Sequence, residues 1–381
     1  MKVAAALSEH PLPTHAVGDA TGEVLEQLDG SPDVAAVFVT SGHAGALEDI
    51  AAAVRTILRP GVLVGAAAVS VIGGHREVED RPGVSVWAAR ARGIQPVRID
   101  TNRTDEGWTI QGLPRRAVDG NRTLVLFADP YSFPAEGFLD QLETTCPGLT
   151  VVGGIAAGAK GPGGSRLVLD DAVHTNGAVG LLLDRDADVT PVISQGCRPI
   201  GEPLVVTRCE RNVVHELGGK PALERLREVV EHLDPEDRQR AATGLQVGLV
   251  INERQATFGT GDFLIRNVLG VDTSVGAVGV AEALSVGQTI QFHLRDAATA
   301  DLDLRAALVG QRGEGALVFT CTGRGQALFG FPDHDADVIS SALGTKATAG
   351  FFAGGELGPV GGRNFLHGFS TSVLVFGPWS E

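Results

Sequence analysis

Residues 35–65 read AAVFVTSGHAGALEDIAAAVRTILRPGVLVG, a strand pattern, a helix pattern and a second strand pattern in succession. In the middle part, apolar residues recur three and four positions apart, as on the buried face of an amphipathic helix. Glu48 and Asp49 lie in its first turn, where the helix dipole favours negative charge, and Pro60 ends it. A helix between two apolar strands predicts a right-handed crossover whose strands are parallel.

Two further stretches show the same succession of patterns. The second copy has strands in TLVLFADP and LTVVGGIAAG around the helix PAEGFLDQLETTCPG, and the third has ALVFTCTG and TAGFFAGGE around DHDADVISSALG. Each copy ends in a glycine-rich loop and a returning strand, so the repeated unit is strand–helix–strand–strand. We therefore predict an α/β fold of mixed β-sheets covered by helices. Three phenylalanines and three glycines mark corresponding positions: Phe38, Phe127, Phe319, Gly65, Gly154 and Gly350.

A strand-rich block, about residues 185–313, separates the second copy from the third. Its last element, AATADLDLRAAL, has helical periodicity, and Asp296 in front of it is a good N-cap. The apolar pattern breaks at DRDADV, residues 184–189. We therefore predict two domains, 1–187 with two repeat units and 188–381 with the strand-rich block and the third unit.

The chain contains 31 Lys and Arg against 46 Asp and Glu, a net charge of −15. Such an acidic surface repels phosphate backbones and anionic lipids, which argues against nucleic-acid and membrane partners. The first residues, MKVAAALSEH, contain too short an apolar run for a signal peptide. The four cysteines form no CxxC pair, which indicates reduced thiols, a cytoplasmic protein and no metal site.

Seven ordered stretches carry a resemblance to a known family: GCRPIGEPLVVT, ELGGKPALERL, GDFLIRNVLGVD, FHLRDA, VFTCTGRG, HDADVI and AGFFAGGELGPVGGRNFLHGFS. Together they resemble the FIST family, whose members carry a FIST N domain and a FIST C domain. The resemblance covers about residues 35–376 and implies a FIST N-type domain over 1–187 and a FIST C-type domain over 188–381. FIST modules are regarded as sensory domains for small ligands, with amino acids proposed as candidates.

The resemblance also has implications for cofactors and partners. Some bacterial relatives bind haem and report nitric oxide, and a eukaryotic branch joins the module to an F-box. FIST modules often stand beside signalling output domains, for which this chain has no room. We therefore expect a small-molecule ligand, a separate signalling partner protein and no cofactor.

Candidate ligand-binding residues follow the ends of the predicted parallel strands, because open α/β sheets bind ligands there. In the third copy these are Cys321, Arg324 and Glu356, the last in the glycine-rich stretch GFFAGGELGPVGG. Arg324 stands between glycines and could hold a ligand anion, while Glu356 could hold a ligand ammonium group. Alternatively, Glu356 caps a helix or pairs with Arg363.

The strand-rich block adds four ligand-binding candidates: Asp262, Arg266, Asn267 and Arg295. Arg266 could bind a ligand carboxylate through two parallel hydrogen bonds or form an ion pair with Asp272. In the third copy, His334 and Asp335 open a helix and are interpreted as capping residues.

Three other functions are compatible with the sequence. Cys321 could be the nucleophile of a cysteine-dependent enzyme, with His334 as its base. A haem-binding gas sensor needs an axial ligand, for which His215, His293 and His367 are candidates. The third alternative is a scaffold whose acidic surface docks a partner protein.

Overall fold

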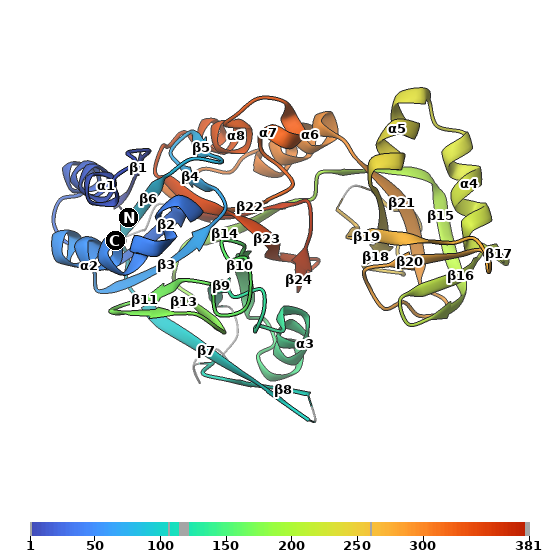
Figure 1. Ribbon diagram of the computed structural model, residues 1–381, viewed down its shortest axis with the longest axis horizontal. Coiled ribbons are helices and arrows are strands. Elements are labelled where there is room, and N and C mark those ends of the chain that lie inside the picture. The colour runs from blue at the N-terminus through green and yellow to red at the C-terminus, as the bar shows by residue number, and fades with distance from the viewer. Residues whose placement is uncertain (1, 106, 114–121, 260, 378–381) are drawn as a thin grey trace. The chain divides into compact units, whose positions relative to one another are not determined.

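Three parallel strand pairs are present in the computed structural model, which describes every residue except 1, 106, 114–121, 260 and 378–381 (Figure 1). An antiparallel strand lies on the other side of the first strand of each pair. These triplets are β2 (Val34–Thr40), β3 (Val62–Ala68) and β6 (Val84–Arg90); β9 (Thr123–Ala128), β10 (Thr150–Ala156) and β13 (Ala178–Leu183); β22 (Gly315–Cys321), β23 (Thr348–Val360) and β25 (Thr371–Phe376). The helices that connect the paired strands are α2 (Leu47–Leu58), α3 (Ala135–Thr145) and α8 (His334–Leu343).

The chain divides into two compact units. The first comprises Met1–Ile193, Leu304–Leu366 and Ser370–Glu381, and the second comprises Ser194–Asp303 and His367–Phe369. All three strand pairs therefore belong to the first unit, whereas the predicted division at 187/188 groups the third pair with the strand-rich block. The difference arises because β23 pairs antiparallel with β10, so the second and third strand pairs share one sheet.

A six-stranded sheet contains the first strand pair. Its order is β1 (Lys2–Ser8), β6, β2, β3, β11 (Leu167–Leu169) and β12 (Ala172–His174). Helices α1 (Pro13–Gln27) and α2 cover one face of this sheet, and the 3-10 helix η1 (Ser41–Ala46) leads into α2. α1 begins at a proline, which suits the first helical position, and it buries Ala16, Ala20 and Val24 at helical spacing.

The second and third strand pairs lie in a twelve-stranded sheet. Its main order is β14 (Val189–Ser194), β25, β22, β23, β10, β9, β13, β7 (Ile94–Thr104) and β8 (Gly107–Gln111). The short strands are β4 (Val71–Gly73), β5 (Arg76–Val78) and β24 (Arg363–His367). α3 packs on the strands around β9 and β10, while α8 and the end of α6 (Ala297–Leu308) pack on those around β22. The four-residue helix α7 (Gln326–Phe329) lies in the connection between β22 and α8.

The two sheets of the first unit pack against each other through an aromatic cluster. Phe38, Phe127, Phe319 and Phe351 are fully buried, and the centroids of contacting rings lie between 5.2 and 5.6 Å apart. The first three are the phenylalanines that correspond in the sequence. One core position from each strand pair therefore meets the others at the centre of the unit.

The stretch GFFAGGELGPVGG, predicted as the end of a strand followed by a glycine-rich loop, lies for most of its length in the strand β23. Its glycines permit close packing, since a Cβ at Gly350 would lie 1.7 Å from the carbonyl oxygen of Val318 in β22. Gly65 and Gly153 occupy the same pairing position in the other two pairs, where a Cβ would lie 2.2 and 2.0 Å from the neighbouring strand's carbonyl oxygen. The corresponding glycine of the second pair is therefore Gly153 and not the predicted Gly154.

The second unit contains a closed ring of six strands. Their order is β15 (Cys197–Glu210), β21 (Thr289–Arg295), β18 (Leu245–Val250), β19 (Phe263–Asp272), β20 (Ala277–Val280) and β16 (Val213–Leu217), and a β15–β16 pairing closes the ring. The short strand β17 (Lys220–Pro221) pairs with β16, and two helices follow it, α4 (Ala222–Glu231) and α5 (Pro235–Thr243). Asp296 accepts a hydrogen bond from the Ala298 amide at 3.0 Å, which confirms its capping role at α6.

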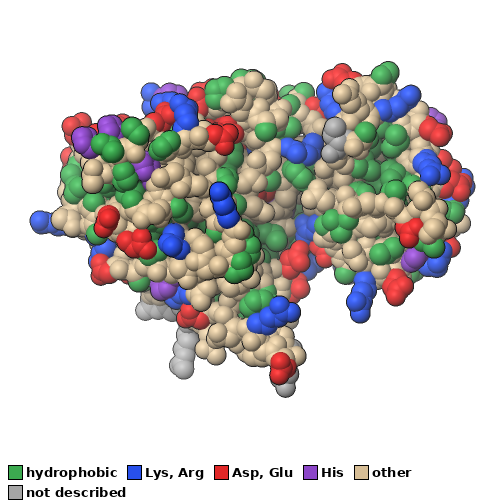
Figure 2. All heavy atoms as spheres, viewed as in Figure 1, with side chains coloured by type: hydrophobic (Ala, Val, Ile, Leu, Met, Phe, Trp, Pro, Cys, Tyr) green, Lys and Arg blue, Asp and Glu red, His purple; other side chains and the backbone are tan. Residues whose placement is uncertain are grey.

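Charged side chains of both signs are mixed on the face shown in Figure 2, where Lys and Arg lie among Asp and Glu. Such mixing reduces the repulsion within a chain that carries a net charge of −15. None of the described helices has the length and apolar character needed to span a membrane.

Candidate functional site

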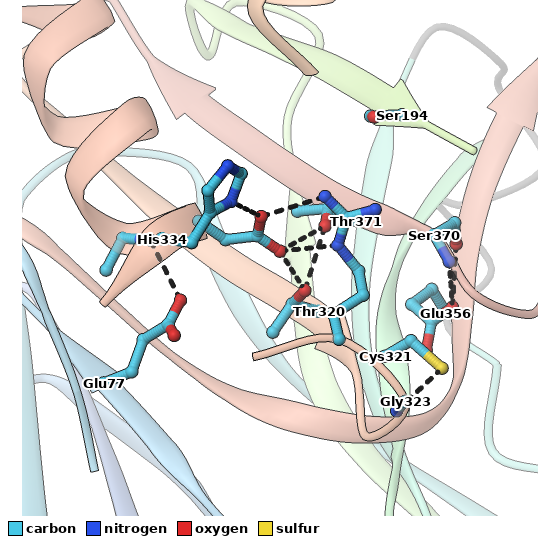
Figure 3. Close-up of polar contacts among 12 residues, drawn as sticks. Glu77, Ser194, Thr320, Cys321, Gly323, His334, Glu356, Ser370 and Thr371 are labelled. Carbon is cyan, nitrogen blue, oxygen red and sulfur yellow. Dashed lines mark hydrogen bonds and ion pairs between the residues drawn. The ribbon is translucent and has the colours of Figure 1, made fainter. Parts of the chain in front are cut away.

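Polar side chains gather where the third strand pair ends. Thr320 and Cys321 are the last residues of β22, Arg324 lies in the turn that follows, and α8 begins at His334. Because successive strand residues point to opposite faces, Thr320 and Cys321 contribute to opposite sides of this strand end. Figure 3 shows the resulting cluster, with His334 on one side of Thr320 and Glu356 on the other.

A buried ion pair forms the centre of the cluster. Arg324 donates from Nε to Oδ2 of Asp335 at 2.6 Å and from Nη2 to Oδ1 at 2.9 Å, and both side chains are 0% exposed. Burial opposes both charges, but the Arg324 charge holds the pKa of Asp335 below its usual range. Burial alone would lower the pKa of Arg324. The charge and hydrogen bonds of its neighbours, those of Asp335 above all, together outweigh this effect, so the pKa of Arg324 is raised above its usual value. The pair is therefore ionised in the folded protein.

Three more side chains complete the hydrogen bonding of Asp335. The hydroxyl groups of Thr320 and Thr371 lie 2.6 and 2.9 Å from its Oδ2, as donors. Nδ1 of His334 lies 2.9 Å from Oδ1, and the His334 ring stacks on Phe329 with centroids 3.4 Å apart. A carboxylate with this many charge-assisted partners is held in one orientation, so it fixes Arg324 in turn.

The N-terminus of α8 is held by Glu77 of β5, and not by His334 or Asp335 as the sequence predicted. Oε1 of Glu77 accepts a hydrogen bond from the Ala336 amide at 3.1 Å (Figure 3). Burial, and then the charge of Asp335, raises the pKa of Glu77 to about 8. Glu77 is therefore mostly protonated at neutral pH.

Glu356 is the second buried acid with a raised pKa. Its Oε2 accepts hydrogen bonds from the Ser370 hydroxyl at 2.7 Å and the Ser370 amide at 3.2 Å. Burial raises the pKa of Glu356 to about 8, although the Ser370 donors and, after them, Arg324 and Cys321 favour the charged form. The two Ser370 donors fix Oε2 as the accepting oxygen, so Oε1 is where a proton resides when Glu356 is neutral.

Cys321 lies between Glu356 and the turn after β22. Its Sγ accepts a hydrogen bond from the Gly323 amide at 3.4 Å, and Figure 3 shows the sulfur next to the carboxyl group of Glu356. Cys321 and Glu356 both interact electrostatically with Arg324. The structure therefore brings together the three residues that the sequence predicted at this strand end.

Three polar atoms of the cluster have no hydrogen-bond partner among the described residues. They are Oε2 of Glu77, beside α8, and, at the end of β22, Nη1 of Arg324 and Oε1 of Glu356, whose side chains are both 0% exposed. Buried polar groups in proteins are nearly always hydrogen-bonded, because an unpartnered one costs about 1–3 kcal/mol. Unpartnered groups on two neighbouring side chains indicate a position for a bound molecule.

The corresponding ends of the other two strand pairs are satisfied internally. Thr40, at the end of β2, accepts a hydrogen bond from the Gly83 amide at 2.9 Å. Asp129, directly after β9, accepts from Ser132 through Oδ2 at 2.5 Å and from Ser165 through Oδ1. Of the three strand ends, as far as the structure describes them, the end of β22 is the one with unpartnered buried groups.

Comparison with known proteins identifies the family. Residues 33–220 match the FIST N domain and residues 222–359 match the FIST C domain. The chain belongs to the FIST family. FIST domains are in general sensory modules that bind small ligands. The two matched ranges meet near residue 221, within the second compact unit.

Mycobacterial relatives match along almost the full length of this FIST chain. An uncharacterized protein of Mycobacterium tuberculosis is 42% identical over 99% of this chain and 100% of its own length. An uncharacterized protein of Mycobacterium bovis is 42% identical over 99% of each chain.

Two ion pairs proposed for FIST candidate residues form with other partners. Arg266 pairs through Nε with Glu282 at 2.8 Å, and not with Asp272. Arg363 pairs with Glu143 at 2.6 Å, and not with Glu356, which lies within a strand and caps no helix. The sequence predicted an acidic partner for each arginine. It did not reveal which acidic residue the fold brings close to it.

The remaining candidates of the FIST chain lie in the second unit. Asp262 accepts a hydrogen bond from the Gly259 amide at 2.8 Å and closes a turn, and Asn267 is exposed. The Arg295 guanidinium lies 4.4 Å from the ring centroid of Phe369. We therefore assign the candidate site to the first unit, where Cys321, Arg324 and Glu356 form one cluster.

The surroundings of His293 do not fit a haem ligand in this FIST chain. The side chain is 2% exposed, and its Nδ1 lies 3.0 Å from the Gln291 carbonyl oxygen. A Cβ at Gly248 would lie 2.5 Å from the His293 ring, and Phe263 packs on the ring at 4.8 Å. Burial lowers the pKa of His293 to about 4. His367 is also buried, His215 is half-buried, and no three His, Cys, Asp or Glu side chains in the described part of the chain are grouped to hold a metal ion.

Sequence reasoning missed several members of the FIST cluster. These are Glu77, Thr320, Ser370, Thr371 and the ion-pairing role of Asp335. The two threonines and Ser370 adjoin predicted strand ends, so alternation along β22 and β25 is a signal that could have found them. Glu77 carries no such signal, because β5 approaches α8 from a distant part of the chain.

Proposed function

We propose that this FIST-family chain is a sensory protein that binds a small ligand at the end of β22, among Cys321, Arg324 and Glu356. The observation that carries the proposal is the pair of unpartnered buried atoms, Nη1 of Arg324 and Oε1 of Glu356. A ligand that bonds to both atoms removes two desolvation penalties of about 1–3 kcal/mol each. The general role of FIST domains in small-ligand sensing supports the same conclusion.

We also propose that the ligand is a cytoplasmic metabolite of about the size of an amino acid, and that a separate partner protein reads the bound state. Arg324 is tied to Asp335, and His334 and Asp335 are the first two residues of α8. A ligand that pulls on the guanidinium therefore acts directly on the start of this helix. The exposed side of α8 is the surface that we assign to the partner.

We further propose that the three strand pairs are copies of one unit, of which the third has acquired the site. They share the same strand pairings, a glycine at the same register position and a phenylalanine in the common core. Polar groups at the first two strand ends bond internally, whereas those at the third are open to a ligand.

A thermal-shift screen of the full chain over amino acids and related metabolites tests the proposed function. We expect at least one compound to raise the unfolding temperature by several degrees, about 2–5 °C, because a ligand that binds the folded state stabilises it. Arg324→Lys keeps the charge but removes Nη1, so the shift should disappear in this variant once circular dichroism shows that it is folded.

Arg363→Lys is the matched control, because Arg363 forms a surface pair with Glu143. The ligand shift should be unchanged in that variant. A shift that persists in Arg324→Lys would place the ligand elsewhere. A folded protein that responds to no compound would contradict the sensory function itself.

A further inference from the structure

The donors and acceptors of the cluster specify a chemical class of ligand. Arg324 uses Nε and Nη2 on Asp335, which leaves the N–H groups of Nη1 as donors without an acceptor. A guanidinium can only donate hydrogen bonds, so the partner of Nη1 has to be an acceptor. This requirement depends on no assumption about the charge of Glu356.

The hydrogen bonds of Glu356 also indicate a ligand that accepts hydrogen bonds. Oε2 already accepts from the Ser370 hydroxyl and amide, so Oε1 is the oxygen that carries the proton of the neutral acid. In that form Oε1–H is a second donor, on a side chain that interacts electrostatically with Arg324 and whose carboxyl group lies beside the Cys321 sulfur. A carboxylate has two oxygens that accept charge-assisted hydrogen bonds, so it can take one bond from each of these donors.

We infer that the ligand of the proposed sensory site presents an oxyanion, in the simplest case a carboxylate, to Nη1 of Arg324 and to Oε1–H of Glu356. This inference rests on the proposed function and reverses the role expected from the sequence, in which Glu356 receives an ammonium group. The buried Arg324–Asp335 pair is electrically neutral, and a neutral Glu356 adds no repulsion against the incoming anion. An ionised Glu356 would repel it at close range.

The groups that face Glu356 make this arrangement sensitive to pH. Cys321 from β22 and Arg324 from the following turn are the titratable groups that act on it, and Ser370, the residue before β25, donates to it. On the other side, β10 contributes the uncharged Gly154 opposite Glu356. Because the pKa of Glu356 is raised to about 8, the donor at Oε1 is present at pH 7 and mostly lost at pH 9.

Calorimetric titration of the full chain with sodium acetate, at pH 7 and pH 9, tests the inference. Acetate is a small fragment and binds weakly, so the titration extends to about 50 mM. We expect the dissociation constant to rise about tenfold between pH 7 and pH 9, because the protonated fraction of a group with a pKa near 8 falls from about 0.9 to about 0.1. Acetamide, which has the same shape without the charge, should bind at least about tenfold more weakly at pH 7.

Glu356→Gln separates the two roles of this residue. The amide keeps a carbonyl oxygen for Ser370 and an N–H donor at the position of Oε1, so acetate should bind within about threefold of the unmodified protein and equally at both pH values. Glu77→Gln is the control, because Glu77 is a second buried acid with a pKa near 8 but bonds to α8. The pH dependence of acetate binding should persist in Glu77→Gln.

Three outcomes would overturn the inference: acetate binding that is lost in Glu356→Gln, that strengthens from pH 7 to pH 9, or that acetamide matches. A hit from the metabolite screen that carries no oxyanion and depends on Arg324 would also overturn it, while the sensory function stands. If neither acetate nor any screened compound binds, both the inference and the proposed function are wrong.

Discussion

Asp335 is the residue on which the arrangement of the candidate site depends. It receives two hydrogen bonds from Arg324 and further ones from Thr320 and Thr371, all within the interior. In water these donors would be satisfied separately, whereas here one carboxylate serves all of them. Removal of the Asp335 carboxylate is costly mainly because it leaves the buried Arg324 guanidinium without a counter-charge.

We predict that Asp335→Asn lowers the free energy of unfolding by about 3–5 kcal/mol, because it leaves the Arg324 charge uncompensated. Urea unfolding followed by circular dichroism measures this loss. Glu143→Gln breaks a surface ion pair with Arg363 and serves as the control, with an expected cost below about 1 kcal/mol. Equal costs for the two variants would show that the buried pair has no special role.

The sequence predicted some members of the site and misinterpreted others for identifiable reasons. Cys321, Arg324 and Glu356 follow predicted strands, and strand ends are where α/β sheets place polar ligand contacts. Asp335 was interpreted as a helix cap because acids in a first helical turn usually have that role. Its partner Arg324 is 11 residues away, across a turn whose course local spacing does not reveal.

The glycines of β23 have a different structural role from glycines in loops. Glycine-rich sequence usually indicates a loop, but in this strand the glycines permit contacts that a side chain would block. At Gly350, a methyl group would overlap the backbone of β22, so parallel pairing at that register requires the bare backbone. The helices and individual strands could be predicted from periodicity. The sheet order could not, because it depends on pairings such as β10 with β23 and β15 with β16.

We predict that Gly350→Ala lowers the free energy of unfolding by about 3 kcal/mol or more, because the added methyl group meets rigid backbone. Gly354→Ala in the same strand is the control. The nearest atom to its methyl group is 3.3 Å away, so a cost below about 1 kcal/mol is expected. Chemical denaturation of both variants measures the difference. A well-tolerated Gly350→Ala would mean that the strand pair can separate slightly without loss.

At the scale of the whole molecule, two buried acids among the described residues link protonation to folding. Glu77 and Glu356 have a pKa of about 8 in the folded state, against an ordinary value of 4.5. Between these values the folded state retains protons that the unfolded chain releases, so stability falls as pH rises from about 5 to about 8 and then levels off. Asp335 acts in the opposite sense, since its pKa is lowered and its contribution is lost only in acid, below about pH 4.

We predict that the unfolding temperature falls by more than about 5 °C between pH 5.5 and pH 8.5, because the unfolded chain releases two protons that the folded chain retains up to about pH 8. The double variant Glu77→Gln, Glu356→Gln should show less than half of this fall. Differential scanning calorimetry across the pH range makes the comparison. A decline of the same size in both proteins would assign the pH dependence to other groups.

The insertion of the second unit between residues 193 and 304 bears on how the protein is made. β10 ends at residue 156 and its partner β23 begins at residue 348, so roughly 190 residues are translated before that edge is paired. At about 5–20 residues per second, this takes about 10–40 s. Throughout that interval the nascent chain presents an open strand edge and an incomplete aromatic core to its surroundings. The ribosome-bound protein is therefore the form most in need of a chaperone, and ring closure in the inserted segment can precede completion of the sheet that flanks it.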